Sequence, residues 1–275
     1  MPQLVIGLDP AYEHLPPFIK SDKLPNIIKW GTMILDAMAG HCVGVKFQSA
    51  YFEAYGMHGY DSLRHLIEYA KQKKYKLIMD AKRGDIGSTS KAYAEAYLSP
   101  TTLYQKNAFC CDYLTVNPLM GEDCLMPFID VAVQHNRGIF VLLETSNPGA
   151  SMILKETSQL GNKINEKIAE FIQAQHQRFG IKGDQIGPIG VVIGATNVDC
   201  AAWRKWLPNS LFLMPGVGAQ GGSMKTAMVC ETKRGNGVWV PISRGITNVT
   251  NAQDEFAFKE GLQKNIQVFK KQLIE

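Results

Sequence analysis

Two carboxylates flank a lysine in the segment Asp80-Ala-Lys82-Arg-Gly-Asp85, which directly follows three apolar residues. Side chains alternate between the two faces of a strand, so Asp80 and Lys82 are expected to point the same way. Asp85 follows a glycine, where the strand is expected to end and the chain can turn. Charged groups rarely remain in apolar surroundings unless they are paired or functional, so this cluster predicts an active site.

The chemistry that such a cluster favours is the loss of a negative group from a substrate. Two unit charges about 4 Å apart interact by roughly 4 kcal/mol at an effective dielectric near 20. A further anion is therefore disfavoured beside a carboxylate, and its departure as CO₂ would be helped. Lys82 could then deliver a proton to the carbon left behind, as a general acid. A structural ion-pair network of the same three residues is the alternative that the spacing alone leaves open.

Eight short apolar runs have the length of buried strands and lack polar alternation, which is typical of parallel strands. They are Leu4–Leu8, Val43–Val45, Leu77–Met79, Tyr113–Val116, Ile139–Leu143, Ile189–Ile193, Leu211–Met214 and Val238–Ile242. Segments with helical spacing lie between and after them. These are the apolar sets Ile27, Ile28, Ile34, Leu35, Met38 and Leu63, Leu66, Ile67, Ala70, and the ranges Thr89–Leu98, Cys124–Gln134, Asn162–Phe179, Val198–Trp206, Ser223–Cys230 and Asp254–Leu273.

This alternation predicts an α/β fold, a (β/α)₈ TIM barrel, and a doubly wound sheet is the rival. No linker or repeat interrupts the chain, so we expect one barrel domain over residues 1–275. The longest stretch without a clear assignment is Pro148–Gly161, which we interpret as a loop.

A barrel of this type carries its functional residues at the carboxyl ends of its strands. Polar residues follow every one of the eight runs. They are Asp9, Lys46, Asp80 with Lys82, Thr115 with Asn117, Glu144 to Ser146, Thr196, Pro215 to Gly222, and Arg244 with Gly245.

Three of these positions have plain binding chemistry and plain structural alternatives. Asp9 could accept hydrogen bonds from sugar hydroxyls, or form a turn before a proline. Lys46 could join the charged cluster, or extend its ammonium out of an apolar site. Ser146 could bond a polar heterocycle, or belong to a β-turn.

The glycine-rich stretch from Gly216 to Gly222 matches G-x-G-x-x-G, but that match alone is weak evidence for a dinucleotide site. It lies late in the chain, and no acidic residue closes the strand that follows. A phosphate cradle fits better, with Gln220 as an amide donor and the Arg244 fork, in Arg244-Gly245, on the anion.

Composition narrows the class of protein. The net charge of +4 is mild and scattered, so no nucleic-acid partner is expected. The amino terminus lacks a signal peptide, and no run approaches the roughly 18 apolar residues of a membrane span. Six cysteines include an adjacent pair but no C-x-x-C. We therefore expect no zinc site and no disulfide framework, but buried free thiols in the cytoplasm.

Taken together, these residues resemble the orotidine 5′-phosphate decarboxylase family. The segment Asp80-Ala-Lys82-Arg-Gly-Asp85-Ile86-Gly-Ser-Thr89 is similar to its D-x-K-x-x-D-I-x-x-T signature, in the form of the longer bacterial branch. The resemblance extends to Gly7-Leu8-Asp9-Pro10, Val45-Lys46, Glu144-Thr-Ser146-Asn-Pro-Gly, Pro215-Gly-Val-Gly-Ala-Gln220 and Ser243-Arg244-Gly245.

The resemblance implies a dimeric barrel that needs no metal or cofactor and converts orotidine 5′-phosphate to UMP and CO₂, the last step of de novo pyrimidine synthesis. It implies a role for each matched residue: Lys82 as proton donor, Asp80 against the substrate carboxylate, Lys46 on Asp80 and the ribose, Asp9 on the ribose, Ser146 on the pyrimidine, Gln220 with Arg244 on the phosphate, and Asp85 with Thr89 in the neighbouring subunit's site. It implies no firm role for Gln48.

Three alternatives stay open at this point. Mg²⁺-dependent sugar-phosphate decarboxylases and aldolases of the same superfamily share the D-x-K-x-x-D core. A nicotinamide oxidoreductase would use the glycine-rich loop. A non-catalytic barrel would bind UMP without releasing CO₂.

Overall fold

The eight apolar runs form eight parallel strands. The computed structural model describes residues 2–20, 24–101, 109–157, 161, 163–196, 199–218 and 221–274, without the side chains of 151 and 272–274. The strands follow one another in the order of a closed barrel, which confirms the (β/α)₈ TIM barrel over the doubly wound sheet. Their bounds are β1 Gln3–Leu8, β2 Gly44–Gln48, β3 Lys76–Arg83, β4 Tyr113–Val116, β5 Gly138–Glu144, β6 Ile189–Ile193, β7 Phe212–Leu213 and β8 Val238–Ile242.

Helices occupy the segments with helical spacing. They are α1 Ile27–Ala37, α2 Ser49–Glu53, α3 Gly56–Gln72, α4 Gly87–Leu98, α5 Glu122–Gln134, α6 Ile164–Arg178, α7 Cys200–Trp206, α8 Met224–Val229, α9 Arg244–Thr247 and α10 Glu255–Ile274, with 3₁₀ turns η1 Tyr12–His14 and η2 Pro148–Met152. Periodicity did not predict α2 and α9, because four or five residues are too few to show a helical repeat. The predicted loop Pro148–Gly161 begins with η2, and its residues 158–160 lie outside the described part.

The chain divides into two compact units. One contains residues 4–81 and 241–275 and is called the terminal unit. The other contains residues 1–3 and 82–240 and is called the central unit. The division falls inside β3, between Ala81 and Lys82, so each unit carries its own share of the predicted site residues.

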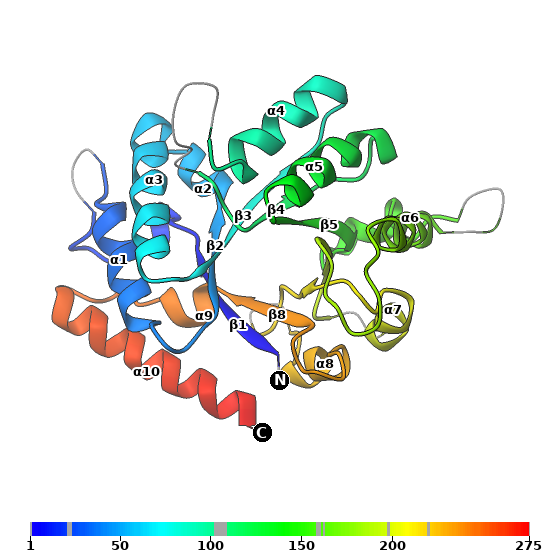
Figure 1. Cartoon of the computed structure of the whole chain (residues 1–275). Helices are drawn as coiled ribbons and strands as arrows, with labels where there is room; N and C mark the ends of the chain where they lie inside the picture. The colour runs from blue at the N-terminus through cyan, green and yellow to red at the C-terminus, as the bar shows by residue number, and fades with distance from the viewer. Residues whose placement is uncertain are drawn as a thin grey trace. The chain divides into compact units, whose positions relative to one another are not determined.

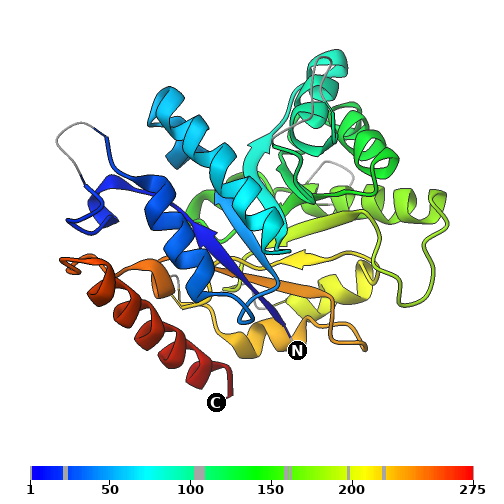
Figure 2. The same ribbon diagram turned by 60° about the vertical axis from the view of Figure 1, so that its left-hand side comes forward.

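In the terminal unit, β1, β2 and β3 pair in parallel, with Gly7 opposite Lys46 and Gln48 opposite Asp80. Helices α1 and α3 lie side by side, and α10 lies along α1 (Figures 1 and 2). The apolar faces of these helices are buried, and burial stabilises a fold by about 25 cal/mol per Å² of apolar surface.

In the central unit, β4 to β7 pair in parallel and α4 packs beside α5 (Figure 1). All five residues of β6 are buried, as expected of a parallel strand that is covered on both faces. The rings of Tyr113 and Phe140 stack with centroids 4.8 Å apart, and Trp239 meets Tyr113 edge-on.

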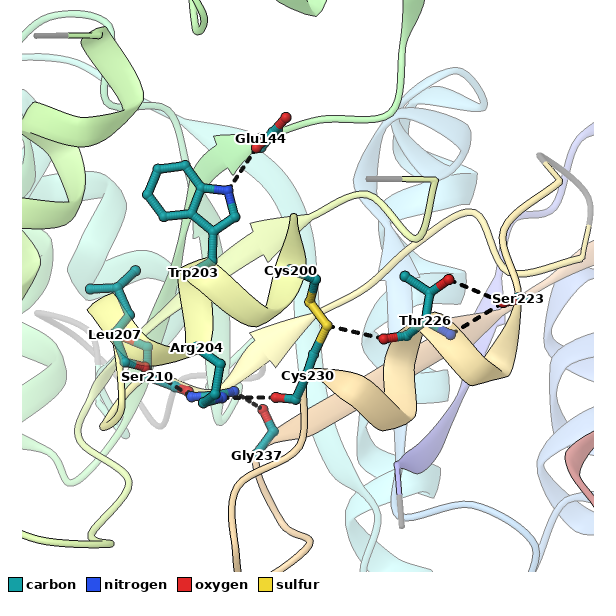
Figure 3. Close-up of a disulfide and its surroundings, with 10 residues drawn as sticks. All are labelled: Glu144, Cys200, Trp203, Arg204, Leu207, Ser210, Ser223, Thr226, Cys230 and Gly237. Carbon is teal, nitrogen blue, oxygen red and sulfur yellow. Dashed lines mark hydrogen bonds between the residues drawn. A yellow bond between two sulfur atoms is a disulfide. The ribbon is translucent and has the colours of Figure 1, made fainter. Parts of the chain in front are cut away.

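The side chain of Arg204 joins several backbone segments of the central unit. Its guanidinium lies 3.6 Å from the centroid of the Phe212 ring. It also donates hydrogen bonds of 2.7–2.9 Å to the backbone carbonyls of four residues that Figure 3 labels: Leu207, Ser210, Cys230 and Gly237. Burial lowers the pKa of Arg204 to about 10, which still leaves the group charged at neutral pH.

The prediction of free thiols was wrong for two cysteines. Cys200, at the start of α7, and Cys230, just after α8, form a disulfide across a sequence separation of 30 (Figure 3). The remaining four cysteines are free, and Cys110, Cys111 and Cys124 are buried as expected. The pairing depends on how two helices pack, and cysteine spacing does not show this.

In the part of the chain that the structure describes, no helix is both long enough and apolar enough to cross a bilayer.

Candidate active site

Lys46 and Asp80 form a buried ion pair at the carboxyl ends of β2 and β3 in the terminal unit. The Nζ atom of Lys46 lies 3.0 Å from Oδ2 of Asp80, and both residues are 7% exposed. Burial alone would lower the pKa of Lys46, but the charges of Asp80 and Asp9 outweigh it, so the pKa is raised. Lys46 is therefore a fixed positive charge that favours the ionised form of Asp80.

Gln48, for which no firm role was predicted, also contacts Asp80. Its Nε2 donates a hydrogen bond of 3.1 Å to Oδ2 of Asp80, the oxygen that Lys46 also contacts. The strand register places Gln48 directly opposite Asp80. Its position two residues after Lys46, on the same face of β2, was the sequence signal that could have revealed it.

Asp9 lies on the other side of the same lysine. Its Oδ1 is 3.8 Å from Nζ of Lys46, which is an ion pair without a hydrogen bond. That oxygen is buried, and no described residue donates a hydrogen bond to it. A buried acceptor without a donor suits a ligand hydroxyl, as predicted for Asp9.

Arg244 begins the short helix α9, directly after β8, and its side chain is exposed, as is Gly245. The preceding Ser243 packs so closely on Gly7 of β1 that a Cβ at Gly7 would collide with the Ser243 hydroxyl. Glycine at position 7 therefore leaves room for Ser243, the residue that precedes the exposed Arg244.

Lys82 has an unusual backbone at the start of the central unit. Its φ is +47°, in the left-handed region that residues other than glycine rarely adopt. Its N–H donates a hydrogen bond of 2.9 Å to Oγ1 of Thr115, on β4. The regular alternation of β3 therefore stops at Lys82, so strand periodicity does not fix its direction relative to Asp80. Residues other than glycine that are held in this region cluster at functional sites.

Asp85 and Thr89 lie around the start of α4. β3 ends at Arg83, as the following glycine predicted. A side-chain oxygen of Asp85 accepts a hydrogen bond of 2.8 Å from the N–H of Ile86. Ile86 is 52% exposed although it is large and apolar, and Thr89 is exposed in the first turn of α4.

Ser146 follows β5 and is half-buried. A Cβ on Gly194, just after β6, would lie 2.7 Å from Cβ of Ser146 and 2.9 Å from its backbone nitrogen. The Ser146 backbone therefore rests on the end of β6, where only glycine fits.

The glycine-rich loop after β7 contains three glycines with positive φ, at Gly216, Gly218 and Gly221. These conformations explain the glycines without reference to a dinucleotide. Gln220 lies outside the described residues. No group of three or more His, Cys, Asp or Glu side chains that could hold a metal ion occurs in the described ranges.

Comparisons with known proteins identify the family of the chain. The model of the orotidine 5′-phosphate decarboxylase / HUMPS family matches residues 2–256. An orotidine 5′-phosphate decarboxylase of Rhodopirellula baltica is 38% identical over 92% of this chain and 85% of its own, and one of Caldicellulosiruptor bescii is 36% identical over 88% and 84%.

Among solved structures, a candidate orotidine 5′-phosphate decarboxylase from Streptomyces avermitilis superposes with a TM-score of 0.81 at 27% identity, covering 100% of this chain and 92% of its own. The family match spans both units, and the relatives align over 84% or more of their own length. The chain therefore belongs to the orotidine 5′-phosphate decarboxylase / HUMPS family.

Proposed function

We propose that this enzyme converts orotidine 5′-phosphate to UMP and CO₂, the last step of de novo pyrimidine nucleotide biosynthesis. The observation that carries the proposal is the buried Lys46–Asp80 pair, which stands two residues before the left-handed Lys82. Relatives that are 36–38% identical over most of the chain bear the name of this activity.

The proposed mechanism depends on charge that is fixed before the substrate arrives. Lys46 and Gln48 hold Asp80 in place, and Lys46 favours its ionised form. The substrate carboxylate beside Asp80 is destabilised relative to the transition state, in which its charge leaves as CO₂. The bond to the carboxyl carbon breaks, its electron pair stays on the ring carbon, and Lys82 supplies the proton to that carbon.

The remaining site residues hold parts of the substrate that do not react. We assign the ribose to Asp9 and Lys46, the pyrimidine edge to Ser146, and the phosphate to Gln220, Arg244 and Gly245. Binding energy from these remote groups can hold the reacting carboxylate in place. The buried Oδ1 of Asp9, which accepts no hydrogen bond from a described residue, supports its share of this assignment.

The proposed assembly is a cytoplasmic homodimer of a single barrel domain, residues 1–275. Asp85 and Thr89 then reach the site of the neighbouring subunit.

A decarboxylation assay tests the function. Loss of orotidine 5′-phosphate absorbance is followed with excess EDTA, for the wild type and for Lys82→Ala. Turnover by the wild type alone is expected. The family description is broader than this one activity, and a chain that acts only on sugar phosphates with added Mg²⁺ would instead belong to the alternative class.

A further inference from the structure

Glu144 is a buried carboxylate to which the proposed mechanism assigns no part. It is the last residue of β5 and is 6% exposed. An ionised side chain in such a place requires partners, because desolvation of an unpaired charge is strongly unfavourable.

The two oxygens of Glu144 have different partners. Oε1 lies 2.7 Å from Nζ of Lys155, which follows η2 in the connection between β5 and α6. Oε2 accepts a hydrogen bond of 2.7 Å from Nε1 of Trp203 on α7 (Figure 3). The carboxylate therefore ties the segment after Ser146 to a neighbouring helix.

The backbone around Glu144 adds a second restraint. Its carbonyl oxygen accepts a hydrogen bond of 2.7 Å from the N–H of Gly194. Gly194 is the residue on which the Ser146 backbone packs without room for a Cβ. Along the chain Ser146 lies between Glu144 and Lys155, which the ion pair joins, and its backbone rests against Gly194.

We propose that Glu144 is a positioning residue that sets the place of Ser146, and through it the affinity for the pyrimidine ring. This proposal rests on the proposed function, in which Ser146 contacts the pyrimidine. Glu144 has no part in the substrate contacts proposed above, and its two oxygens contact Lys155 and Trp203. Its effect is therefore confined to ligands that carry the ring.

The test compares two ligands that share ribose and phosphate. UMP carries the pyrimidine, whereas ribose 5-phosphate does not. In Glu144→Gln the ion pair with Lys155 is lost while one oxygen can still accept from Trp203, and in Lys155→Met the same pair is lost from the other side. We expect both variants to bind UMP about tenfold more weakly, the order for one lost hydrogen bond to the ring. Their affinity for ribose 5-phosphate should stay unchanged.

A double-mutant cycle identifies the route of the effect. If Glu144 acts through Ser146, Glu144→Gln adds little to the loss in UMP affinity already caused by Ser146→Ala. Glu170→Gln, an exposed carboxylate on α6, is the matched control and should change neither affinity.

Several results would overturn the proposal. Equal losses for UMP and ribose 5-phosphate would mark Glu144 as a general structural residue, and unchanged UMP affinity would remove it from the site. Additive effects in the cycle would show that it does not act through Ser146. If the wild type neither turns over orotidine 5′-phosphate nor binds UMP, the proposed function itself has failed, which is a different outcome.

Discussion

Lys46 donates a hydrogen bond of 3.0 Å to Asp80, and neither side chain is accessible enough for water to replace the other. Removing the lysine leaves a buried carboxylate with a charge that is no longer balanced. Breaking a buried pair from one side typically costs about 3–5 kcal/mol. This pair therefore matters for stability as well as for chemistry.

We predict that Lys46→Met lowers the free energy of unfolding by about 3–5 kcal/mol at neutral pH and abolishes turnover. Urea unfolding and the decarboxylation assay measure the two effects. Lys73→Met is the matched control, because Lys73 pairs with Asp36 at the surface and its loss should lower the free energy of unfolding far less.

The pKa of Lys46 is raised in the folded state, so its stabilisation is complete below the unfolded pKa of 10.5 and is lost only as pH rises through the higher folded value. The stability gap between the wild type and Lys46→Met should hence not shrink between neutral and mildly alkaline pH. Equal costs for the two lysines would contradict the role given to the buried pair.

Two substitutions of Lys82 distinguish the effect of its left-handed backbone on stability from the effect of its side chain on turnover. Both Lys82→Ala and Lys82→Gly should lose turnover, since neither can donate the proton. Glycine relieves the left-handed backbone, so Lys82→Gly should be more stable than Lys82→Ala by about 0.5–1 kcal/mol. Ala81→Gly, one residue earlier in β3, should change stability in the opposite direction. Retained decarboxylation in either Lys82 variant would sink the assignment of this lysine as proton donor.

Arg244 should act on ligand binding and not on stability. We expect Arg244→Ala to weaken binding of UMP and of ribose 5-phosphate alike, by about tenfold to hundredfold, because both carry the phosphate. Calorimetric titration measures both affinities, and the melting temperature should be unchanged because the side chain is exposed. Arg234→Ala serves as the exposed control. If Arg244→Ala binds both ligands normally, Arg244 has no place in the phosphate site.

The proposed dimer predicts complementation between two inactive variants. Lys82→Ala and Asp85→Ala, unfolded together and refolded as a mixture, would form mixed dimers in which one site of two has both groups. With random pairing, about one quarter of the wild-type activity should return. Each variant refolded alone is the control, and a mixture that stays inactive would place Asp85 outside the partner's site.

The disulfide predicts a thiol count. Denatured, unreduced protein should expose four thiols, and reduction should raise the count to six. Cys200→Ser should lower the free energy of unfolding by about 2–4 kcal/mol under oxidising conditions, and much less in the presence of a reductant. Cys124→Ser, at a free and buried cysteine, should show no dependence on the reductant. Six thiols without reduction would show that the pair is open in solution.

The sequence predicted the fold well, since buried parallel strands are apolar throughout. The runs Tyr113–Val116, Ile189–Ile193 and Val238–Ile242 coincide with β4, β6 and β8. The pairing of Lys46 with Asp80 also follows from strand ends that share one edge of a barrel.

Other parts of the site depend on three-dimensional detail. The contact of Gln48 with Asp80 requires the register of β2 against β3, which apolar runs do not fix. The left-handed backbone of Lys82 is imposed by its neighbours, whereas its residue type disfavours it. The partners of Glu144 come from loops and helices far along the chain, so its position at a strand end gave no sign of them.

The contacts of Arg204 restrict which residues can replace it. Its planar guanidinium donates hydrogen bonds to carbonyls in several directions, and its flat face stacks on the ring of Phe212. A lysine would bring the same charge, but its three donors share one atom and it has no flat face to stack. Arg204→Lys would therefore leave some of these carbonyls, at the junction of α7, β7 and β8, to find their hydrogen-bond donors in water.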